Sequence, residues 1–228
     1  MPHSPPPRPP PAAAHVRDDA LLRHIPAQDY RRVRWRNGLG WTREVMQWPG
    51  DGDWDWRASV TEIEADAAFS SFPGIERSLV LLQGEGLQLH VEGHTHAGGT
   101  GPSVSAVDPP HGRCDFDGDR AVRAVLHAGP VHVFNLMWRR GRLQADLWRR
   151  PLVGSMVLFA VPDEQWVVYA LAGHAMVGDG ERRLHLAAGD SALIAAHAAR
   201  LRCMIEGGGE ILLARLRPVD ASGRQSTD

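Results

Sequence analysis

The chain contains no lysine, so all 25 of its basic side chains are arginine. This absence excludes Schiff-base chemistry and the lysine of a phosphate-binding loop. Arginine stays protonated in proteins at neutral pH and presents a planar fork that suits carboxylates. A genome rich in G and C would produce the same usage without any functional cause.

Cysteine and long apolar runs are also scarce. Two cysteines, Cys114 and Cys203, are too few for a disulfide framework or a thiolate zinc site, and we expect buried reduced thiols. No apolar run approaches the roughly 20 residues that cross a bilayer, and the N-terminus lacks the apolar segment of a signal peptide. A net charge of -2 gives no basic surface for nucleic acid. We therefore expect a soluble cytoplasmic protein with neither a membrane nor a nucleic-acid partner.

The sequence is rich in short β signals. Apolar runs separated by Gly, Pro and Asp occur at residues 78–82, 122–126, 131–137, 157–161, 167–171, 193–195 and 211–216. Residues 87–91 alternate with period two, and no segment reads as a long amphipathic helix. This pattern favours an all-β sandwich or barrel over a doubly wound sheet. The Gly-, Pro- and Ser-rich residues 98–113 predict a surface loop between strands.

A weak internal echo predicts two related β-barrel halves. Residues 81–87 and 170–176 each read as a strand, a glycine turn and a returning strand. The halves should meet near residues 140–155. The predicted organisation is a Pro- and Ala-rich tail, an N-terminal half, a C-terminal half and a second tail, at residues 1–17, 18–145, 146–218 and 219–228.

Three ordered blocks go beyond generic β sequence. Residues 35–44 read Trp-Arg-Asn-Gly-Leu-Gly-Trp-Thr-Arg-Glu, residues 56–59 read Trp-Arg-Ala-Ser, and residues 69–77 read Phe-Ser-Ser-Phe-Pro-Gly-Ile-Glu-Arg. Together they resemble the HutD/Ves family, and the resemblance covers about residues 22–217. It implies a cupin fold, a double-stranded β-helix in which one chain holds two jelly-roll halves.

The metal motif of ordinary cupins is missing from the first half. That pattern is His-x-His, then three or four residues, then Glu, then six residues, then Gly; with Gly84 as the glycine, Arg77 stands at the glutamate position and Ser71 and Pro73 at the histidines. A guanidinium repels a divalent cation but attracts an anion. The same count from Gly173 yields no ligand set in the second half. We therefore expect no cofactor and a site for a small carboxylate.

Alternation in residues 56–60 puts Arg57 and Ser59 on one face of a strand. If that face lines the barrel, the charge of Arg57 must meet Glu44, Glu62 or a bound anion, because an unpaired buried charge is costly. The alternative is a structural salt bridge or an outward-facing arginine, and it applies equally to Arg77. Residues 37–42 could bind ligand or simply cap a turn. The predicted ligand-binding set is Arg57, Arg77, Ser59, Asn37, Thr42 and Asn135.

The resemblance implies a link to histidine utilisation, and we expect a regulatory protein, non-enzymatic or weakly active, whose ligand is of the N-formylglutamate or urocanate type. Two other functions remain open. One is a cupin enzyme, either with a metal on His94 and His96, which should lie in a turn after a strand, or metal-free with Glu44 or Glu62 as base. The other is an interaction module that forms a homodimer through tryptophans and exposed strands.

Overall fold

The computed structural model describes residues 20–50, 52–96 and 99–219. Within these ranges the chain forms strands and one 3-10 turn, η1 (Ala27–Asp29), and no α-helix, which confirms the all-β prediction. The predicted tails fall outside these ranges, apart from residue 219. No helix in the described ranges has the length and apolar character needed to cross a membrane.

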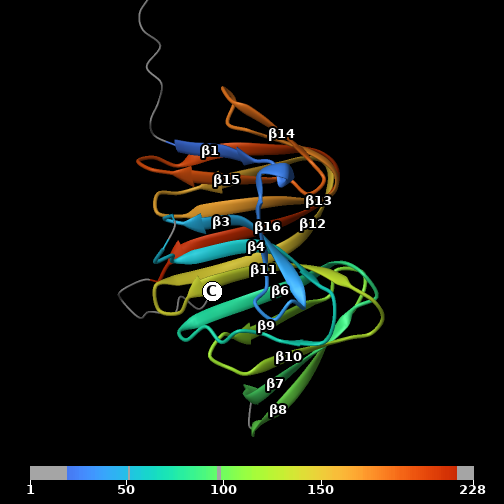
Figure 1. Cartoon of the computed structure of the whole chain (residues 1–228). Helices are drawn as coiled ribbons and strands as arrows, with labels where there is room; N and C mark the ends of the chain where they lie inside the picture. Colours follow the sequence, from blue (N-terminus) through green and yellow to red (C-terminus); the bar gives the residue numbers. More distant parts are fainter. Residues whose placement is uncertain (1–19, 51, 97–98, 220–228) are drawn as a thin grey trace, which may run out of the picture.

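The N-terminal half contains two antiparallel sheets. The first sheet has the order β2-β3-β4-β11-β6-β9. Its strands are β2 (Arg31–Arg34), β3 (Gly40–Trp48), β4 (Trp56–Ile63), β11 (Val131–Arg139), β6 (Ile75–Gln83) and β9 (Arg113–Asp117). The second sheet consists of β5 (Ala67–Ala68), β10 (Val122–Leu126), β7 (Leu87–His96) and β8 (Gly99–Val107), in that order. Figure 1 shows β10, β7 and β8 of the second sheet below β6 and β9 of the first. Leu79 and Leu81 of the first sheet pack against Leu87 and Leu89 of the second, which places one apolar core between the two.

The C-terminal half is built on one sheet of long, bent strands, in the order β1-β15-β13-β16-β12. They are β1 (Ala20–Ile25), β15 (Ser191–Ala196), β13 (Gln165–Gly178), β16 (Leu201–Pro218) and β12 (Leu143–Ala160), and β14 (Arg183–Ala187) pairs with β13. β12 and β16 pair over 18 residues each, so the short strands predicted at residues 157–161 and 211–216 are parts of much longer ones. A turn at residues 140–142 joins β11 to β12.

The two halves share a core. Trp56 of β4 is fully buried there, and its indole N–H donates a hydrogen bond to the side-chain oxygen of Gln165 in β13. The rings of Phe134 and Tyr169 lie 5.2 Å apart across the same boundary. The first sheet thus turns one face toward the C-terminal half. Its other face is free to line a cavity inside the N-terminal half.

The first strand of the chain belongs to the sheet of the C-terminal half. β1 pairs with β15 over six residues, and Figure 1 shows the two strands side by side, blue against orange-red. The carboxylate of Asp190 accepts hydrogen bonds from the backbone N–H groups of Ala27 at 2.8 Å and Ala187 at 3.0 Å. The hydroxyl of Tyr30 donates to the carbonyl of Gly189 at 2.7 Å. These bonds fix the point where β2 begins.

Three local predictions were wrong. Residues 99–107, expected in a loop, form β8, because pairing with β7 supplies the backbone hydrogen bonds that the composition alone does not suggest. His94 and His96 lie in β7 and not in a turn after it. Gly173 lies inside β13 beside a shift in register, so the second copy of the echo is a bulge within a strand. The first copy does turn, with Gly84 at φ 105° between β6 and β7.

Candidate functional site

A cavity of about 530 Å³ lies in the N-terminal half, and we call it the arginine pocket. Its floor comes from alternate residues of four neighbouring strands of the first sheet: Thr42, Arg57, Ser59, Thr61, Arg77, Leu79, Val133, Asn135 and Met137. Its rim comes from residues 33–37, which run from the end of β2 into the loop before β3, and from Ala68, Phe69, Ser70 and Phe72, before β6. All six residues of the predicted binding set line this one cavity.

Strand alternation explains the composition of the floor. In β4, Arg57 and Ser59 face the pocket, whereas Trp56 and Ala58 pack into the core between the halves. The same period extends the pocket face to Thr61 and, in β11, to Met137. Sequence reasoning missed these last two residues, although the alternation itself could have identified them.

Arg77 is buried at the bottom of the site, with 7% of its surface exposed. Its Nη2 donates to the amide oxygen of Asn135 at 3.4 Å, and its Nε has no hydrogen-bond partner within the described ranges. The guanidinium carbon lies 4.8, 5.2 and 5.7 Å from the ring centres of Phe116, Phe69 and Phe72. No ion pair among the described residues includes Arg77. The aromatic cage therefore surrounds a cation without its own carboxylate.

The environment of Arg77 disfavours its charge. Burial, and then the nearby charge of Arg57, lower the pKa of Arg77 to about 10. The aromatic rings offset part of this cost through cation–π attraction, which is worth about 0.5–2 kcal/mol. A bound anion would offset more of it.

Arg57 lies nearer the surface and has an acidic neighbour. Its Nε is 3.5 Å from a carboxylate oxygen of Glu44, close enough for attraction but without a hydrogen bond. Glu44 is shared, because Arg31 donates to it at 3.0 Å and Gln47 at 2.6 Å. Burial lowers the pKa of Arg57, Glu44 opposes the shift, and Arg31 adds to it. Of the two acids expected from the sequence, the partner is Glu44, since Glu62 pairs with Arg32 at 3.4 Å.

Asn37 and Thr42 line the pocket but are also used to hold the rim. The side-chain oxygen of Asn37 accepts a hydrogen bond from the backbone N–H of Leu39 at 3.0 Å. The hydroxyl oxygen of Thr42 accepts one from the indole N–H of Trp35 at 2.9 Å. Trp35 in turn packs edge-on against Phe69, with ring centres 6.1 Å apart. These contacts match the turn-capping alternative, and each side chain keeps polar capacity for a ligand.

The pocket does not fit the metal site of ordinary cupins. None of the described residues that line it is a His, Cys, Asp or Glu, and divalent metals need such donors. Ser71, at one histidine position of the motif, donates its hydroxyl to the carbonyl of Gly118 instead. Across the described ranges no three such residues gather to hold a metal. The side chains of His94 and His96 lie outside the described residues.

Comparison with known proteins gives a consistent assignment. A family model described as HutD matches residues 27–213. The chain is 35% identical over 128 residues to an uncharacterized 21.2 kDa protein in the hutC 3' region of Pseudomonas putida; this stretch covers 55% of the chain and 63% of that protein. It is 33% identical over 148 residues to protein Ves of Citrobacter koseri, covering 64% of the chain and 70% of Ves.

Solved structures extend the likeness to the fold. A conserved protein of unknown function from Pseudomonas aeruginosa PAO1 matches with a TM-score of 0.75 and 25% identity, over 87% of this chain and 98% of that one. HutD from Pseudomonas fluorescens SBW25 matches with a TM-score of 0.73 and 27% identity, over 87% and 100%. An oxalate decarboxylase of Lactobacillus farciminis, at 10% identity, 86% coverage of each chain and a TM-score of 0.62, shares the cupin fold alone. The chain therefore belongs to the HutD family of cupin-fold proteins.

Proposed function

We propose that this protein binds a small carboxylate in the arginine pocket, without a metal, and that binding serves regulation and not turnover. One observation carries the proposal: Arg77 is buried beneath the cavity and has no ion-pair partner among the described residues. An unpaired buried charge costs several kcal/mol unless something compensates it. Buried charges that destabilise the fold in this way occur mainly at functional sites.

The chemistry around Arg77 and Arg57 suits a carboxylate. A guanidinium binds a carboxylate through two parallel N–H···O bonds, and the Nε atoms of both arginines lack hydrogen-bond partners in the described part of the chain. Asn135 and Ser59 add neutral polar groups beside them. The cavity volume of about 530 Å³ falls in the usual range for metabolite sites.

Family membership supports a link to histidine utilisation, because one relative is named for its position in the hutC 3' region. The intermediates of that pathway include urocanate, a planar imidazole acid, and N-formylglutamate, a dicarboxylate. Phe69 and Phe72 offer flat apolar surface for such a body, while the arginines take its carboxylate. Sensing one of these acids would let the protein limit flux through the pathway.

A binding role is favoured over catalysis because the described lining of the pocket holds no side chain suited to general base catalysis. Glu44 and Glu62, the acids considered from the sequence, do not line the cavity. Glu44 is held by Arg31, Gln47 and Arg57, and Glu62 pairs with Arg32.

Thermal unfolding and titration calorimetry with urocanate, N-formylglutamate and glutamate test the proposal. At least one acid should raise the Tm of the wild type and bind with measurable heat, and Arg57→Ala should lose that response. Arg142→Ala is the matched control, because Arg142 pairs with Asp55 at 2.8 Å and does not line the pocket. If no acid stabilises the wild type, or Arg57→Ala responds as well as the control, the proposal fails.

Two further measurements separate the alternatives. Chromatography after incubation with each acid should return it unchanged, and a new product would favour the enzyme reading. Metal analysis of the purified protein should give no stoichiometric zinc, iron or manganese, and finding one would contradict the metal-free site.

A further inference from the structure

The aromatic cage over Arg77 depends on a segment that is not itself a strand. Residues 69–74 run between β5 and β6 and carry Phe69 and Phe72 to the pocket. Sheet hydrogen bonds hold most pocket residues in place, and the backbone N–H of Phe69 donates to the carbonyl of Val122 in β10 at 2.8 Å. The rest of this segment needs another support. Its anchors decide where the phenyl rings lie relative to the guanidinium.

The support is the tight turn between β9 and β10. The carbonyl of Gly118 accepts a hydrogen bond from the backbone N–H of Phe72 at 2.7 Å and one from the hydroxyl of Ser71 at 3.3 Å. The N–H of Gly118 donates to the carbonyl of Ile75 at 2.7 Å. A Cβ at Gly118 would lie 2.7 Å from the carbonyl oxygens of Phe72 and Ile75, so the contact admits only glycine.

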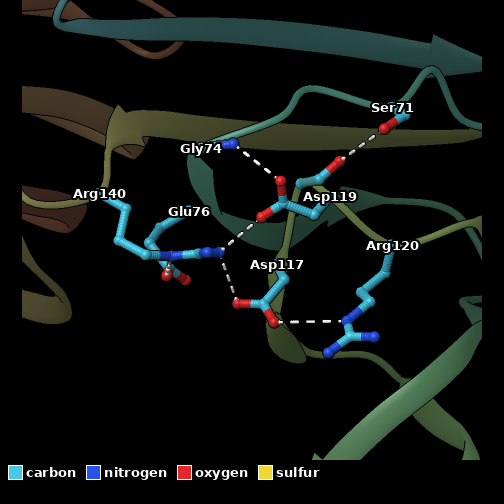
Figure 2. Close-up of polar contacts among 8 residues, drawn as sticks. Ser71, Gly74, Glu76, Asp117, Asp119, Arg120 and Arg140 are labelled. Carbon is cyan, nitrogen blue, oxygen red and sulfur yellow. Dashed lines mark hydrogen bonds and ion pairs between the residues drawn. The ribbon is translucent and has the colours of Figure 1, made fainter.

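Arg140 connects this turn to the segment through Asp119, which contacts both Arg140 and Gly74, as Figure 2 shows. Its guanidinium lies 2.5 Å from Glu76, 2.9 Å from Asp117 and 3.0 Å from Asp119. Asp119 also accepts the backbone N–H of Gly74 at 2.9 Å. The backbone N–H of Arg140 donates to the carbonyl of Gly74 at 2.9 Å. The side chain of Arg140 thus links the start of β6, the end of β9 and the turn that follows β9.

This network differs from an ordinary surface ion pair. Isolated exposed ion pairs contribute little to stability. A guanidinium that faces three carboxylates, one of which also accepts a backbone N–H, restricts a whole loop. The hydrogen bond from Gly74 holds the pKa of Asp119 below its usual value, and the hydrogen bond with Glu76 raises that of Arg140, so both stay charged at neutral pH.

We propose that Arg140 is a positioning residue for the arginine pocket: with Asp119 and Gly118 it forms a clamp that holds Phe72 over Arg77, and ligand affinity depends on it although it does not line the cavity. The effect on affinity rests on the proposed carboxylate-binding function. The effect on the segment itself does not.

Four variants of the full chain test the clamp: Arg140→Gln, Phe72→Ala, the double variant, and Arg142→Gln as a matched control on the same turn. Hydrogen exchange of the ligand-free proteins, read by NMR at the amides of Phe72 and Gly74, should be about ten-fold faster in Arg140→Gln than in wild type or control, because local opening becomes easier. Equal exchange in Arg140→Gln and Arg142→Gln overturns the clamp.

Calorimetry with urocanate and with N-formylglutamate adds the test on affinity. Arg140→Gln should weaken binding about ten-fold, Phe72→Ala by a similar factor, and the double variant no more than Phe72→Ala alone, because coupled residues are not additive. Additive losses would show that Arg140 acts by another route and contradict the inference. If neither acid binds the wild type, the proposed function fails, while the exchange measurement still decides the clamp.

Discussion

Arg77 and Asn135 meet across the strands β6 and β11, where the guanidinium donates a 3.4 Å hydrogen bond to the amide oxygen and both side chains are buried. An amide oxygen carries only a partial charge, so it orients the guanidinium without neutralising it. The site is thereby left with a fixed cation and space above it. The first three predictions below follow from this pair.

Replacing Arg77 with methionine should abolish carboxylate binding and leave the ligand-free protein equally or more stable. Removing a buried charge relieves its desolvation cost. Even the replacement of a whole buried ion pair by apolar residues is often neutral or stabilising by about 1–4 kcal/mol, and Arg77 has no acid partner in the described ranges that its removal would leave unpaired. Calorimetry and denaturant unfolding measure the two effects. As a contrast, Arg215→Met should destabilise, because Arg215 pairs with Asp146 at 2.8 Å. A large stability loss in Arg77→Met would instead make Arg77 a structural residue.

Changing Asn135 to aspartate should supply the missing carboxylate from within the protein. The new charge would lie at hydrogen-bond distance from Arg77, raise its pKa and compete with any bound acid. We expect affinity for urocanate or N-formylglutamate to fall by at least about ten-fold, a loss of roughly 1.4 kcal/mol. Asn135→Ser, which keeps a neutral polar group, is the control. Unchanged affinity in Asn135→Asp would place the carboxylate site elsewhere.

Affinity for a carboxylate should decline at alkaline pH. Burial and the charge of Arg57 lower the pKa of Arg77 to about 10, so its charge is complete at neutral pH and is lost as the pH rises through that value. Binding constants should be flat from neutral pH and then fall by up to about ten-fold per pH unit. Titrations with parallel circular dichroism exclude unfolding. Affinity that stays constant well above pH 10 would argue that Arg77 does not contact the ligand.

Asp190→Asn should destabilise the contact between the residues that follow β1 and the turn before β15. Burial alone would raise the pKa of Asp190, but the N–H groups of Ala27 and Ala187 and the ring of His24 outweigh it and lower the pKa. A depressed carboxyl pKa stabilises the fold above the unfolded value and loses that contribution as the pH falls through the folded value. We expect a cost of about 1–3 kcal/mol at neutral pH, shrinking in acid. Urea unfolding of both proteins against pH measures it, and a pH-independent difference would contradict this account.

Much of the pocket could be predicted from local pattern. Period-two alternation put Arg57 and Ser59 on one face, and counting back from Gly84 picked out Arg77 as the residue in place of a metal ligand. These inferences succeed because strand geometry alternates side chains whatever the strand pairs with. The same logic failed at Gly173, where a bulge inside β13 mimics a turn.

The sequence by itself determined the all-β class, the HutD motifs and which side chains of β4 share a face with Arg57. Only the tertiary structure decided that Phe116 completes the cage over Arg77 and that β1 pairs with β15. It also decided that Arg140 pairs with Asp119, which binds the backbone of residues 69–74 at Gly74. The physical reason is distance along the chain. β1 and β15 are separated by more than 150 residues, and no local periodicity encodes which distant partner satisfies a backbone N–H or a charge.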